Sequence, residues 1–218
     1  MAPRFRNLIF DLDGTLTDSR PGIVQCIHAA LQSVGAEAPV NDDLSWCIGP
    51  PMRDILARLL ATEDRQRIEQ AYSAYLENFP KYGIAGNRPY DGIPEILRRL
   101  RTAGIDCFVA TSKITANAEH VLNTFELRQY FEMVVGSDAA GTLTDKAEMI
   151  QSILERAKIH RAACAIIGDR EHDILAGKAN SIFTIGASWG YAADGELRSA
   201  GAALIIDSPA TLGGFLLS

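Results

Sequence analysis

The chain has 218 residues, which is enough for one large domain or for one domain that carries a smaller insertion. Hydrophobic residues make up 47% of it, so a sizeable core can be buried, and the formal net charge is −6. An acidic balance disfavours nucleic acid or an anionic membrane as the main partner, because both need clustered Lys and Arg. A small anionic substrate stays open, since it responds to a local field rather than to net charge.

The four cysteines are widely spaced and form no CxxC pair. They are Cys26, Cys47, Cys107 and Cys164, and the pattern predicts buried free thiols rather than a disulfide framework or a zinc site. Near the N-terminus the apolar run 8–10 is too short for a signal peptide. No apolar stretch approaches the roughly 20 residues of a membrane span. A cytoplasmic protein without a membrane partner is therefore predicted.

Six short apolar runs are predicted to be strands: 8–11, 105–111, 133–136, 164–168, 183–185 and 204–206. They are nearly continuous rather than alternating, which is typical of parallel strands that helices cover on both faces. Helical patterns separate most of these runs, and the alternation predicts an α/β fold, a Rossmann-like doubly wound parallel sheet. One helix is expected to end at Gly104, and another to span 171–179 with Asn180 as a left-handed stop.

One region after the first strand breaks this alternation. From about residue 18 to residue 83 the sequence has helical periodicity and no convincing strand. Ser19 is placed to cap the first helix, with Pro21 in its first turn. Turn-rich stretches bound the region on both sides. An inserted α-helical cap domain over residues 17–85 is therefore predicted, and residues 1–16 and 86–218 would form the core domain.

The segment 10–17, which reads FDLDGTLT, places two carboxylates directly after an apolar strand. Alternate residues of an extended strand share a face, so Asp11 and Asp13 are expected to point the same way. Like charges in a partly buried site repel one another, and a divalent cation would offset that cost. Gly14 then permits a sharp turn whose amides face an anion. A pair of solvated aspartates in a turn is the alternative reading of an isolated DxD.

The whole octapeptide resembles the first motif of the haloacid dehalogenase-like hydrolase superfamily. The resemblance implies a Ser or Thr at the end of a second strand to bind phosphate, and Thr111 takes that place, although a helix cap would also explain it. It also implies a catalytic Lys, which Lys146 supplies at the start of a predicted helix. Family members often carry proline after this Lys, whereas Ala147 stands here, and Lys113 is the competing candidate.

The resemblance further implies an acidic metal-binding motif, which Asp169 and Asp173 match. They are four residues apart and share one side if Asp173 lies on the first turn of a helix. The helix dipole alone would explain Asp173, but it explains Asp169 poorly because that acid follows four apolar residues. All these segments end strands of one parallel sheet, where ligands of open α/β sheets bind.

A metal-dependent mechanism follows from the resemblance. Mg²⁺ would be held by Asp11, the backbone carbonyl of Asp13 and Asp169, with Asp173 assisting directly or through water. Asp11 would attack phosphorus and form an aspartyl-phosphate, while Asp13 would act first as an acid and then as a base. Lys146 would add a second positive charge.

Substrate binding is also implied by the resemblance. Thr111 and the backbone amides of Leu12 and Ser112 would hold the phosphoryl oxygens. Residues 49–53, which read GPPMR, resemble the family's specificity loop, and Arg53 would meet a second anionic group. An exposed Arg at a helix start is an equally good account of Arg53. The expected substrate is a small phosphate monoester, because the closest resemblance is to the phosphoglycolate phosphatase-like and 5′-nucleotidase-like branch with a helical cap.

Two other functions fit part of the pattern. A phosphomutase would use the same fold and the same covalent chemistry. A receiver-type signalling domain would be phosphorylated on Asp without turning over a substrate, and it also combines clustered acids with a Thr and a Lys. The DxDGT turn and the large helical insertion speak against the receiver.

Overall fold

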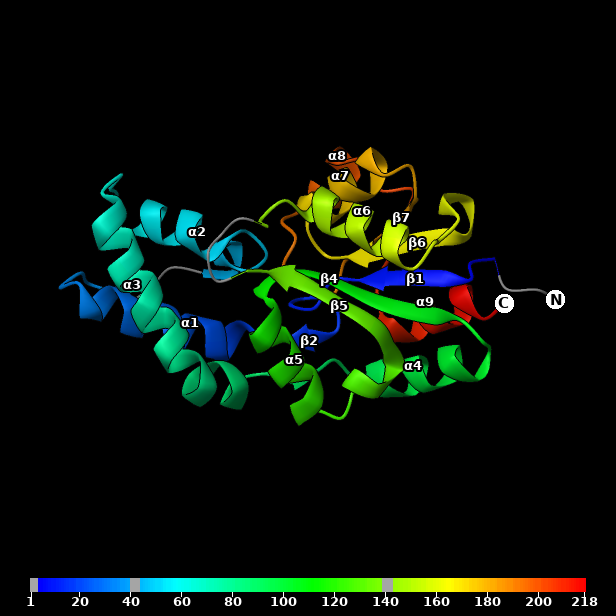
Figure 1. Ribbon diagram of the computed structural model, residues 1–218, viewed down its shortest axis with the longest axis horizontal. Helices are drawn as coiled ribbons and strands as arrows, with labels where there is room; N and C mark the ends of the chain where they lie inside the picture. The colour runs from blue at the N-terminus through cyan, green and yellow to red at the C-terminus, as the bar shows by residue number, and fades with distance from the viewer. Residues whose placement is uncertain (1–3, 40–43, 139–142) are drawn as a thin grey trace.

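The computed structural model describes residues 4–39, 44–138 and 143–218. Its centre is a six-stranded sheet in the order β5-β4-β1-β6-β7-β8, in which every neighbouring pair is parallel (Figure 1). The strands are β1 (Asn7–Phe10), β4 (Asp106–Ile114), β5 (Phe131–Ser137), β6 (Cys164–Gly168), β7 (Phe183–Ala187) and β8 (Leu204–Ile206). All six predicted strands are present, and the predicted doubly wound α/β fold is confirmed.

Helices cover both faces of this sheet. The helices α6 (Lys146–Arg156) and α7 (Glu171–Ala179) lie on one face, while α4 (Ile93–Thr102), α5 (Thr115–Thr124) and α9 (Pro209–Leu216) lie on the other (Figure 1). Within β1, Leu8 and Phe10 join one hydrophobic cluster and Ile9 joins the other. Apolar side chains are therefore needed in both directions, which is why the strand sequences do not alternate. Short elements complete this part: η3 (Arg128–Tyr130), η4 (Arg161–Ala163) and α8 (Glu196–Ser199).

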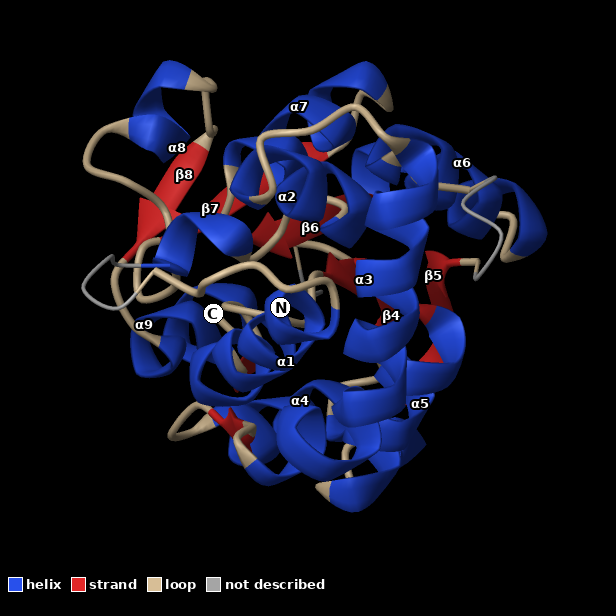
Figure 2. Cartoon of the chain, turned by 90° about the vertical axis from the view of Figure 1, so that its left-hand side faces the viewer, coloured by secondary structure: helices blue, strands red, loops and turns tan. Residues whose placement is uncertain are grey.

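The predicted helical region forms a separate layer beyond the carboxyl ends of the strands (Figures 1 and 2). It contains α1 (Arg20–Ser33), η1 (Leu44–Cys47), α2 (Met52–Leu59), α3 (Arg65–Asn78) and the π-helical turn η2 (Phe79–Gly83). The apolar faces read from the sequence are mostly buried, as at Ile27 of α1, Leu56 of α2 and Tyr75 of α3. Helix α1 packs against α3 and η2. The exact boundaries of a cap domain stay a prediction.

Two short strands that the sequence pattern did not reveal connect this layer to the sheet. Residues Thr17–Asp18 form β2 and Arg88–Pro89 form β3, and the two pair in antiparallel fashion. Arg88 and Asp18 also form an ion pair of 3.1 Å. Two residues are too few to give a periodic signal. We call β2 and β3 together the hinge, because the chain enters and leaves the helical layer through them.

The helix ends agree with the sequence only in part. Gly104 follows α4 with φ of +71°, as expected for a left-handed end. Asn180 is not left-handed, since its φ is −90°, and Ser181 takes that conformation instead with φ of +55°. The Asn180 side chain donates to the carbonyls of Ala147 and Ala176, so it ties α7 to α6 rather than forming the turn.

The cap of α1 also differs from the expectation. Ser19 stands at the N-cap position and Pro21 lies in the first turn, but the Ser19 side chain makes no capping hydrogen bond. The backbone N–H groups of Ser19 and Arg20 both donate to the hydroxyl oxygen of Tyr191, at 2.9 and 3.1 Å. A residue 172 positions away therefore caps this helix.

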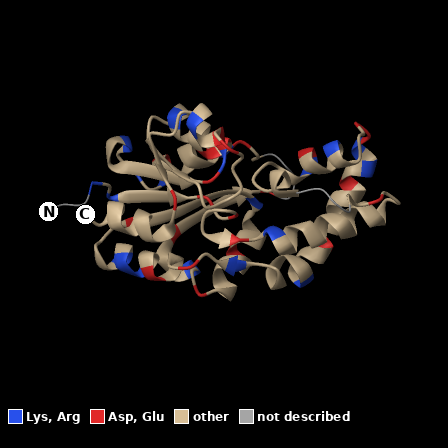
Figure 3. Ribbon diagram, turned by 180° about the vertical axis from the view of Figure 1, so that it is seen from behind, with Lys and Arg blue, Asp and Glu red and all other residues tan. Residues whose placement is uncertain are grey.

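The four cysteines are buried and free, as the spacing predicted. Acidic and basic residues are interspersed along the helices (Figure 3). Within the described residues, none of the helices combines the length and the apolar character that a membrane span requires. The cytoplasmic location remains a prediction.

Candidate active site

The two central strands define where the site lies. The chain runs from β1 to β4 and β5 on one side, whereas β6, β7 and β8 follow on the other side of β1. The strand order therefore reverses between β1 and β6, and such a switch point leaves a crevice at the carboxyl ends of the strands. Asp11 follows β1 and Asp169 follows β6, so both acids enter that crevice. The Asp11 N–H donates to the Ile167 carbonyl at 2.9 Å, and this hydrogen bond aligns the end of β1 with the end of β6.

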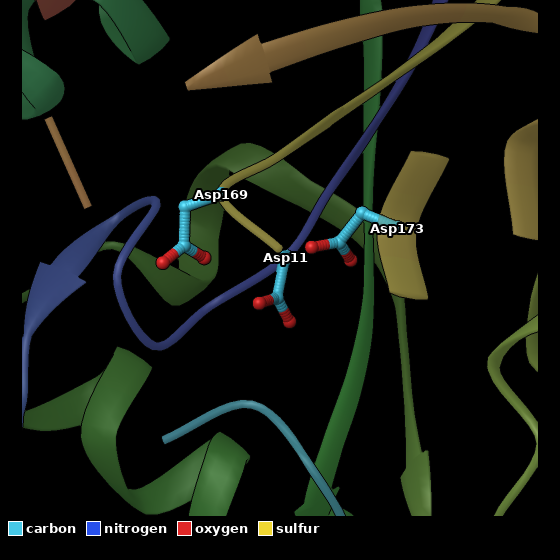
Figure 4. Close-up of side chains that lie close together, drawn as sticks. All are labelled: Asp11, Asp169 and Asp173. Atoms are coloured by element: carbon cyan, nitrogen blue, oxygen red, sulfur yellow. The ribbon is translucent and has the colours of Figure 1, made fainter. Parts of the chain in front are cut away.

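Three carboxylates meet at this point. Asp11, Asp169 and Asp173 each offer an oxygen atom, and these three atoms lie within 4.8 Å of one another (Figure 4). All three residues are at most 1% exposed. Gly14 lies against them with φ of +88°, and a Cβ there would be 2.1 Å from Asp169 Oδ2. The glycine of the FDLDGTLT segment is therefore required both by its backbone conformation and by the space that Asp169 occupies.

Burial of these acids changes their titration. Desolvation raises the pKa of Asp11 to about 7, and the charges of Asp173 and Asp13 add to the rise while Lys146 opposes it. Desolvation, together with Asp11 and Asp173, also raises the pKa of Asp169 well above its ordinary value. A cluster of this kind is costly until a cation neutralises it. Three buried carboxylates are oxygen ligands of the type that Mg²⁺ prefers, so the donor set fits the predicted metal.

Two buried lysines flank the acids and pair with different partners. Lys146 begins α6, and its Nζ lies 2.9 Å from Asp11 Oδ1 and 2.6 Å from Asp173 Oδ1. Burial acts to lower the pKa of Lys146, but the two carboxylates outweigh it and hold that pKa above its ordinary value. Lys113 instead lies 2.9 Å from Asp13 Oδ2. Of the two candidates from the sequence, it is Lys146 that stands beside Asp11.

Asp13 is the fourth acid, and it lies outside the three-carboxylate cluster. One of its oxygens pairs with Lys113, whose Nζ also lies 4.6 Å from the centre of the Phe79 ring. The other oxygen, Oδ1, is buried and has no hydrogen-bond partner among the described residues. Asp13 lines the large cavity described below. It therefore offers one unengaged carboxylate oxygen to whatever enters that cavity.

The segment that was predicted to bind phosphate lies within a strand rather than after one. The sequence predicted that the strand would end at Thr111, but β4 continues to Ile114 and α5 begins at Thr115. The pairing with β5 shifts register between Thr111 and Ile114. Such an irregularity re-aims side chains, and it is common next to active sites. Thr111 is 1% exposed, lines the cavity and accepts a 3.3 Å hydrogen bond from the Lys113 N–H.

A cavity of about 590 Å³ lies between the sheet edge and the helical layer. From the sheet side it is lined by Asp11, Asp13, Thr111, Ser112, Lys113 and Asn117, and from the helical layer by Ile23, residues 47–54, Arg65, Ile68, Glu69, Tyr72, Tyr75 and Leu76. Thr111 and Ser112 of the sheet edge and Arg53 of the helical layer, all predicted to bind substrate, thus line the same cavity. The Leu12 side chain points into the core, and its backbone N–H donates to no partner within the described part of the chain.

Arg53 lies on the cavity wall with two partners that the sequence did not indicate. It forms a two-pronged ion pair with Glu69, at 2.6 and 3.0 Å, and its guanidinium lies 3.9 Å from the centre of the Tyr72 ring. The hydrogen bond raises the pKa of Arg53 and lowers that of Glu69. Arg53 belongs to α2 and the other two belong to α3, so no spacing in the sequence links them.

Asp169 is held by residues that sequence reasoning missed. Its Oδ2 accepts a 2.8 Å hydrogen bond from the Tyr191 N–H, and its Oδ1 accepts one of 3.2 Å from the Thr15 hydroxyl. Asp173 Oδ2 accepts from the Arg170 N–H at 3.0 Å. Thr15 lies inside the first motif, so its presence there was a signal. Residues 189–191 follow β7 and carried no signal.

The fold and the site together define an α/β enzyme whose acidic and basic groups gather at a topological switch point. A model of the family described as haloacid dehalogenase-like hydrolase matches residues 8–187. A 5′-nucleotidase of Pseudomonas aeruginosa is 37% identical over 198 residues, which cover 91% of this chain and 89% of that protein. The crystal structure described as a predicted phosphatase from Clostridium acetobutylicum superposes with a TM-score of 0.92 at 32% identity, and covers 98% of both chains.

Another relative carries a different activity in its name. The tyrosine-protein kinase PtkA of Mycobacterium tuberculosis is 37% identical over 184 residues, which cover 84% of this chain and 62% of PtkA.

This chain belongs to the haloacid dehalogenase-like hydrolase family, as its motifs predicted. The prediction that it is a phosphatase of this family is also confirmed.

Proposed function

We propose that the chain is a magnesium-dependent phosphatase that hydrolyses a small phosphate monoester through an aspartyl-phosphate on Asp11. The observation that carries the proposal is the position of Asp11. It is buried at the end of β1, in contact with Lys146, within reach of Asp169 and Asp173, and on the wall of a cavity. A carboxylate so placed is shielded from bulk water yet accessible to a substrate.

Asp11, Asp169 and Asp173 would hold the Mg²⁺, with the backbone carbonyl of Asp13 as a further oxygen ligand. When bound, the ion neutralises charge on the phosphoryl oxygens and lets an anion approach an anion. Asp173 is already engaged by Lys146 and by the Arg170 N–H. Both carboxylate oxygens of Asp173 thus already have a partner. Asp173 would contact the ion either through an oxygen that it shares with such a partner or through a bridging water.

The covalent step is assigned to Asp11. One carboxylate oxygen attacks phosphorus, a P–O bond to Asp11 forms, and the bond from phosphorus to the ester oxygen breaks. Lys146, which contacts Asp11 Oδ1, keeps a positive charge beside the reacting oxygens throughout. Thr111 and the backbone N–H groups of Leu12 and Ser112 would hold the remaining phosphoryl oxygens.

Proton transfer is assigned to Asp13. Its Oδ2 is paired with Lys113, so the transferable proton belongs on Oδ1, the atom without a partner among the described residues. Asp13 gives this proton to the departing alkoxide and then takes one from the water that attacks the aspartyl-phosphate. Attack of that water breaks the bond between phosphorus and Asp11, releases phosphate and restores both acids.

The cavity wall supports a substrate with more than a phosphate group. Tyr72, Ile68 and Leu76 give it an apolar and aromatic side, while Arg53 and Arg65 offer guanidinium groups for an anion beside the acids Asp54 and Glu69. A phosphoglycolate-like or nucleotide-like monoester fits this chemistry. The aromatic side and the relative named 5′-nucleotidase favour the nucleotide-like class.

Phosphate release from a panel of monoesters, measured with Mg²⁺ and with EDTA, tests the proposal. We expect turnover with Mg²⁺, none with EDTA, and a fall of at least about 10³-fold for Asp11→Asn because the nucleophile is lost. Asp106→Asn is the matched control, since this exposed Asp lies at the opposite end of the neighbouring strand β4. Turnover of the Asp11→Asn protein at a near-normal rate would refute the assignment.

The reaction products distinguish a phosphatase from a transferase that forms the same aspartyl-phosphate. Free phosphate indicates transfer to water. An isomerised phosphate ester would indicate a phosphomutase, and phosphotyrosine formed from ATP would indicate the activity in the name of PtkA. A receiver domain is not a candidate, because the chain belongs to the hydrolase family.

A further inference from the structure

We propose that Tyr191 is a positioning residue that couples the hinge of the helical layer to the carboxylate of Asp169. The proposal rests on the proposed function in one respect, namely that Asp169 is a metal ligand. Tyr191 touches Asp169 through its backbone and the hinge through its side chain. One residue thus bridges the acidic cluster and the segment through which the chain enters the helical layer.

The contact with Asp169 is tight. The Tyr191 N–H donates to Asp169 Oδ2 at 2.8 Å. A Cβ at Gly190 would lie 2.4 Å from Asp169 Oδ2 and 2.4 Å from the Gly14 carbonyl, and a Cβ at Gly14 would lie 2.7 Å from the Tyr191 ring. No side chain fits between the loop and the carboxylate, so a displacement of either one is transmitted to the other.

The contact with the hinge uses every hydrogen-bonding site of the phenol. The Tyr191 hydroxyl donates to Asp18 Oδ1 at 2.9 Å, and its oxygen accepts from the N–H groups of Ser19 and Arg20 at 2.9 and 3.1 Å. Desolvation, with the nearby Tyr90 and Asp18, raises the pKa of Tyr191 well above its ordinary value, so the hydroxyl stays protonated and can donate. It supplies the N-terminal cap of α1 that the Ser19 side chain does not.

The same loop has a second tie to the segment before the hinge. Trp189 Nε1 donates to the Thr15 carbonyl at 3.1 Å, and the Thr15 hydroxyl donates to Asp169 Oδ1 at 3.2 Å. Asp18 lies in β2 and pairs with Arg88 of β3, so the hydroxyl of Tyr191 reaches both strands of the hinge through Asp18. The loop 189–191 therefore touches the acid, the first motif and the hinge.

Coupling between two sites is reciprocal. A cation that fixes the Asp169 carboxylate also fixes residues 190 and 191, and these hold the first amides of α1. Opening of the hinge then costs more when the cation is bound, and a closed hinge raises the affinity for the cation by the same factor. Tyr191 contributes no group to the reacting atoms, since it acts only through Asp169 and the hinge.

Hydrogen exchange of the full-length Tyr191→Phe protein, with Mg²⁺ alone as the ligand, tests the coupling. In the wild-type protein we expect Mg²⁺ to slow exchange of the Ser19 and Arg20 amides by about 5-fold or more. In Tyr191→Phe the backbone contact to Asp169 persists, so Mg²⁺ should still bind, with a Kd by calorimetry within about 10-fold of wild type. The slowing of these two amides by Mg²⁺ should disappear.

Tyr130→Phe is the matched control, because Tyr130 lies in η3 on the far side of the sheet domain, and it should behave as the wild type. Equal slowing by Mg²⁺ in Tyr191→Phe and in the wild type would overturn the coupling while leaving the metal site intact. Slowing in neither protein despite Mg²⁺ binding would overturn it as well. Failure of the wild type to bind Mg²⁺ would overturn the proposed function together with this inference.

A second variant guards against misfolding of Tyr191→Phe. Asp18→Ala removes the acceptor of the Tyr191 hydroxyl, and it should weaken the slowing by Mg²⁺. Asp18 also pairs with Arg88, so Arg88→Gln is the control for that ion pair and should keep the slowing. Equal slowing in Asp18→Ala and Arg88→Gln would contradict the part of the route that runs from the Tyr191 hydroxyl through Asp18.

Discussion

The charged groups at the sheet edge and those on the wall of the helical layer are built in opposite ways. At the sheet edge, the Lys146 side chain is 5% exposed and is held between two carboxylates that are 2% and 0% exposed. On the wall, the Arg53 and Glu69 side chains of the ion pair are 27% and 53% exposed. A surface pair contributes roughly 0–1 kcal/mol, whereas breaking a buried pair costs about 3–5 kcal/mol.

The difference indicates how the two regions divide the work. The buried groups are fixed before a substrate arrives, and fixed charges are what stabilise a transition state most effectively. The exposed pair can rearrange around whatever part of a substrate lies beyond the phosphate. Changes at the sheet edge should therefore affect every substrate alike, and changes on the wall should affect substrates selectively.

The largest expected effect is at the sheet edge. Lys146→Met removes the cation between Asp11 and Asp173 and leaves two buried carboxylates facing one another. We expect kcat to fall by about 10²–10³-fold for every monoester, because stabilisation of the reacting oxygens is lost. The metal-free protein should also lose about 3–5 kcal/mol of unfolding free energy in urea titrations.

Lys158→Met serves as the matched control, because Lys158 is exposed at the end of α6, the helix that Lys146 begins. It should retain wild-type turnover and stability. A Lys146→Met protein that slowed one substrate strongly and spared another would contradict the division of work, since it would place Lys146 among the specificity groups.

A smaller effect is expected in the pH dependence of stability. The pKa of Asp11 is about 7 in the folded protein and 3.8 in its ordinary state. Between these values the folded protein keeps a proton that the unfolded chain has released, so the free energy of unfolding falls as pH rises and levels off above pH 7. Mg²⁺ should cancel this fall, because it binds the carboxylate form.

Urea unfolding in EDTA at pH 5 and pH 7.5 measures the effect. Asp11→Asn lacks the titrating group, so its fall over this range should be smaller than that of the wild type, by at most about 2.5 kcal/mol. Parallel pH profiles for the two proteins would show that burial of Asp11 is not what destabilises the metal-free cluster. The charged groups of the sheet edge would then affect stability as little as the exposed ion pair on the wall does.

The features that the sequence predicted best are those of the sheet edge. The strands and the acids at their ends were recognisable because a buried parallel strand needs a continuous apolar run, and a carboxylate directly after such a run is anomalous without a cation. Thr111 lines the same cavity as Asp11, although β4 continues beyond it. These are local signals, in which neighbours in the sequence carry the information.

The features that were missed depend on contacts between distant residues. The Ser19 side chain was expected to cap α1, but the cap is supplied by the hydroxyl of Tyr191, which comes from the loop after β7. Asn180 was expected to be left-handed, but its amide is engaged by α6 and Ser181 takes the turn. In both cases a residue with the right local propensity is used by tertiary structure in another way.

The smallest expected effect is on the cavity wall. Arg53→Gln removes the positive charge but keeps a polar side chain, and we expect turnover of p-nitrophenyl phosphate within about 3-fold of wild type, because the sheet edge is untouched. For the preferred substrate from the panel, KM should rise by about 5–30-fold with kcat little changed, since one charged contact contributes roughly 1–2 kcal/mol. Stability should change by less than about 1 kcal/mol.

Glu69→Gln separates the two roles of Arg53. It removes the carboxylate partner and leaves the guanidinium beside Tyr72. If Arg53 binds an anionic group of the substrate, Glu69→Gln should leave KM unchanged or lower it, because Glu69 no longer competes for the guanidinium. If the ion pair only supports the wall, both variants should raise KM alike. A loss of kcat of about 10²-fold for both substrates in Arg53→Gln would erase the contrast with Lys146, because the wall would then contribute to the chemistry itself.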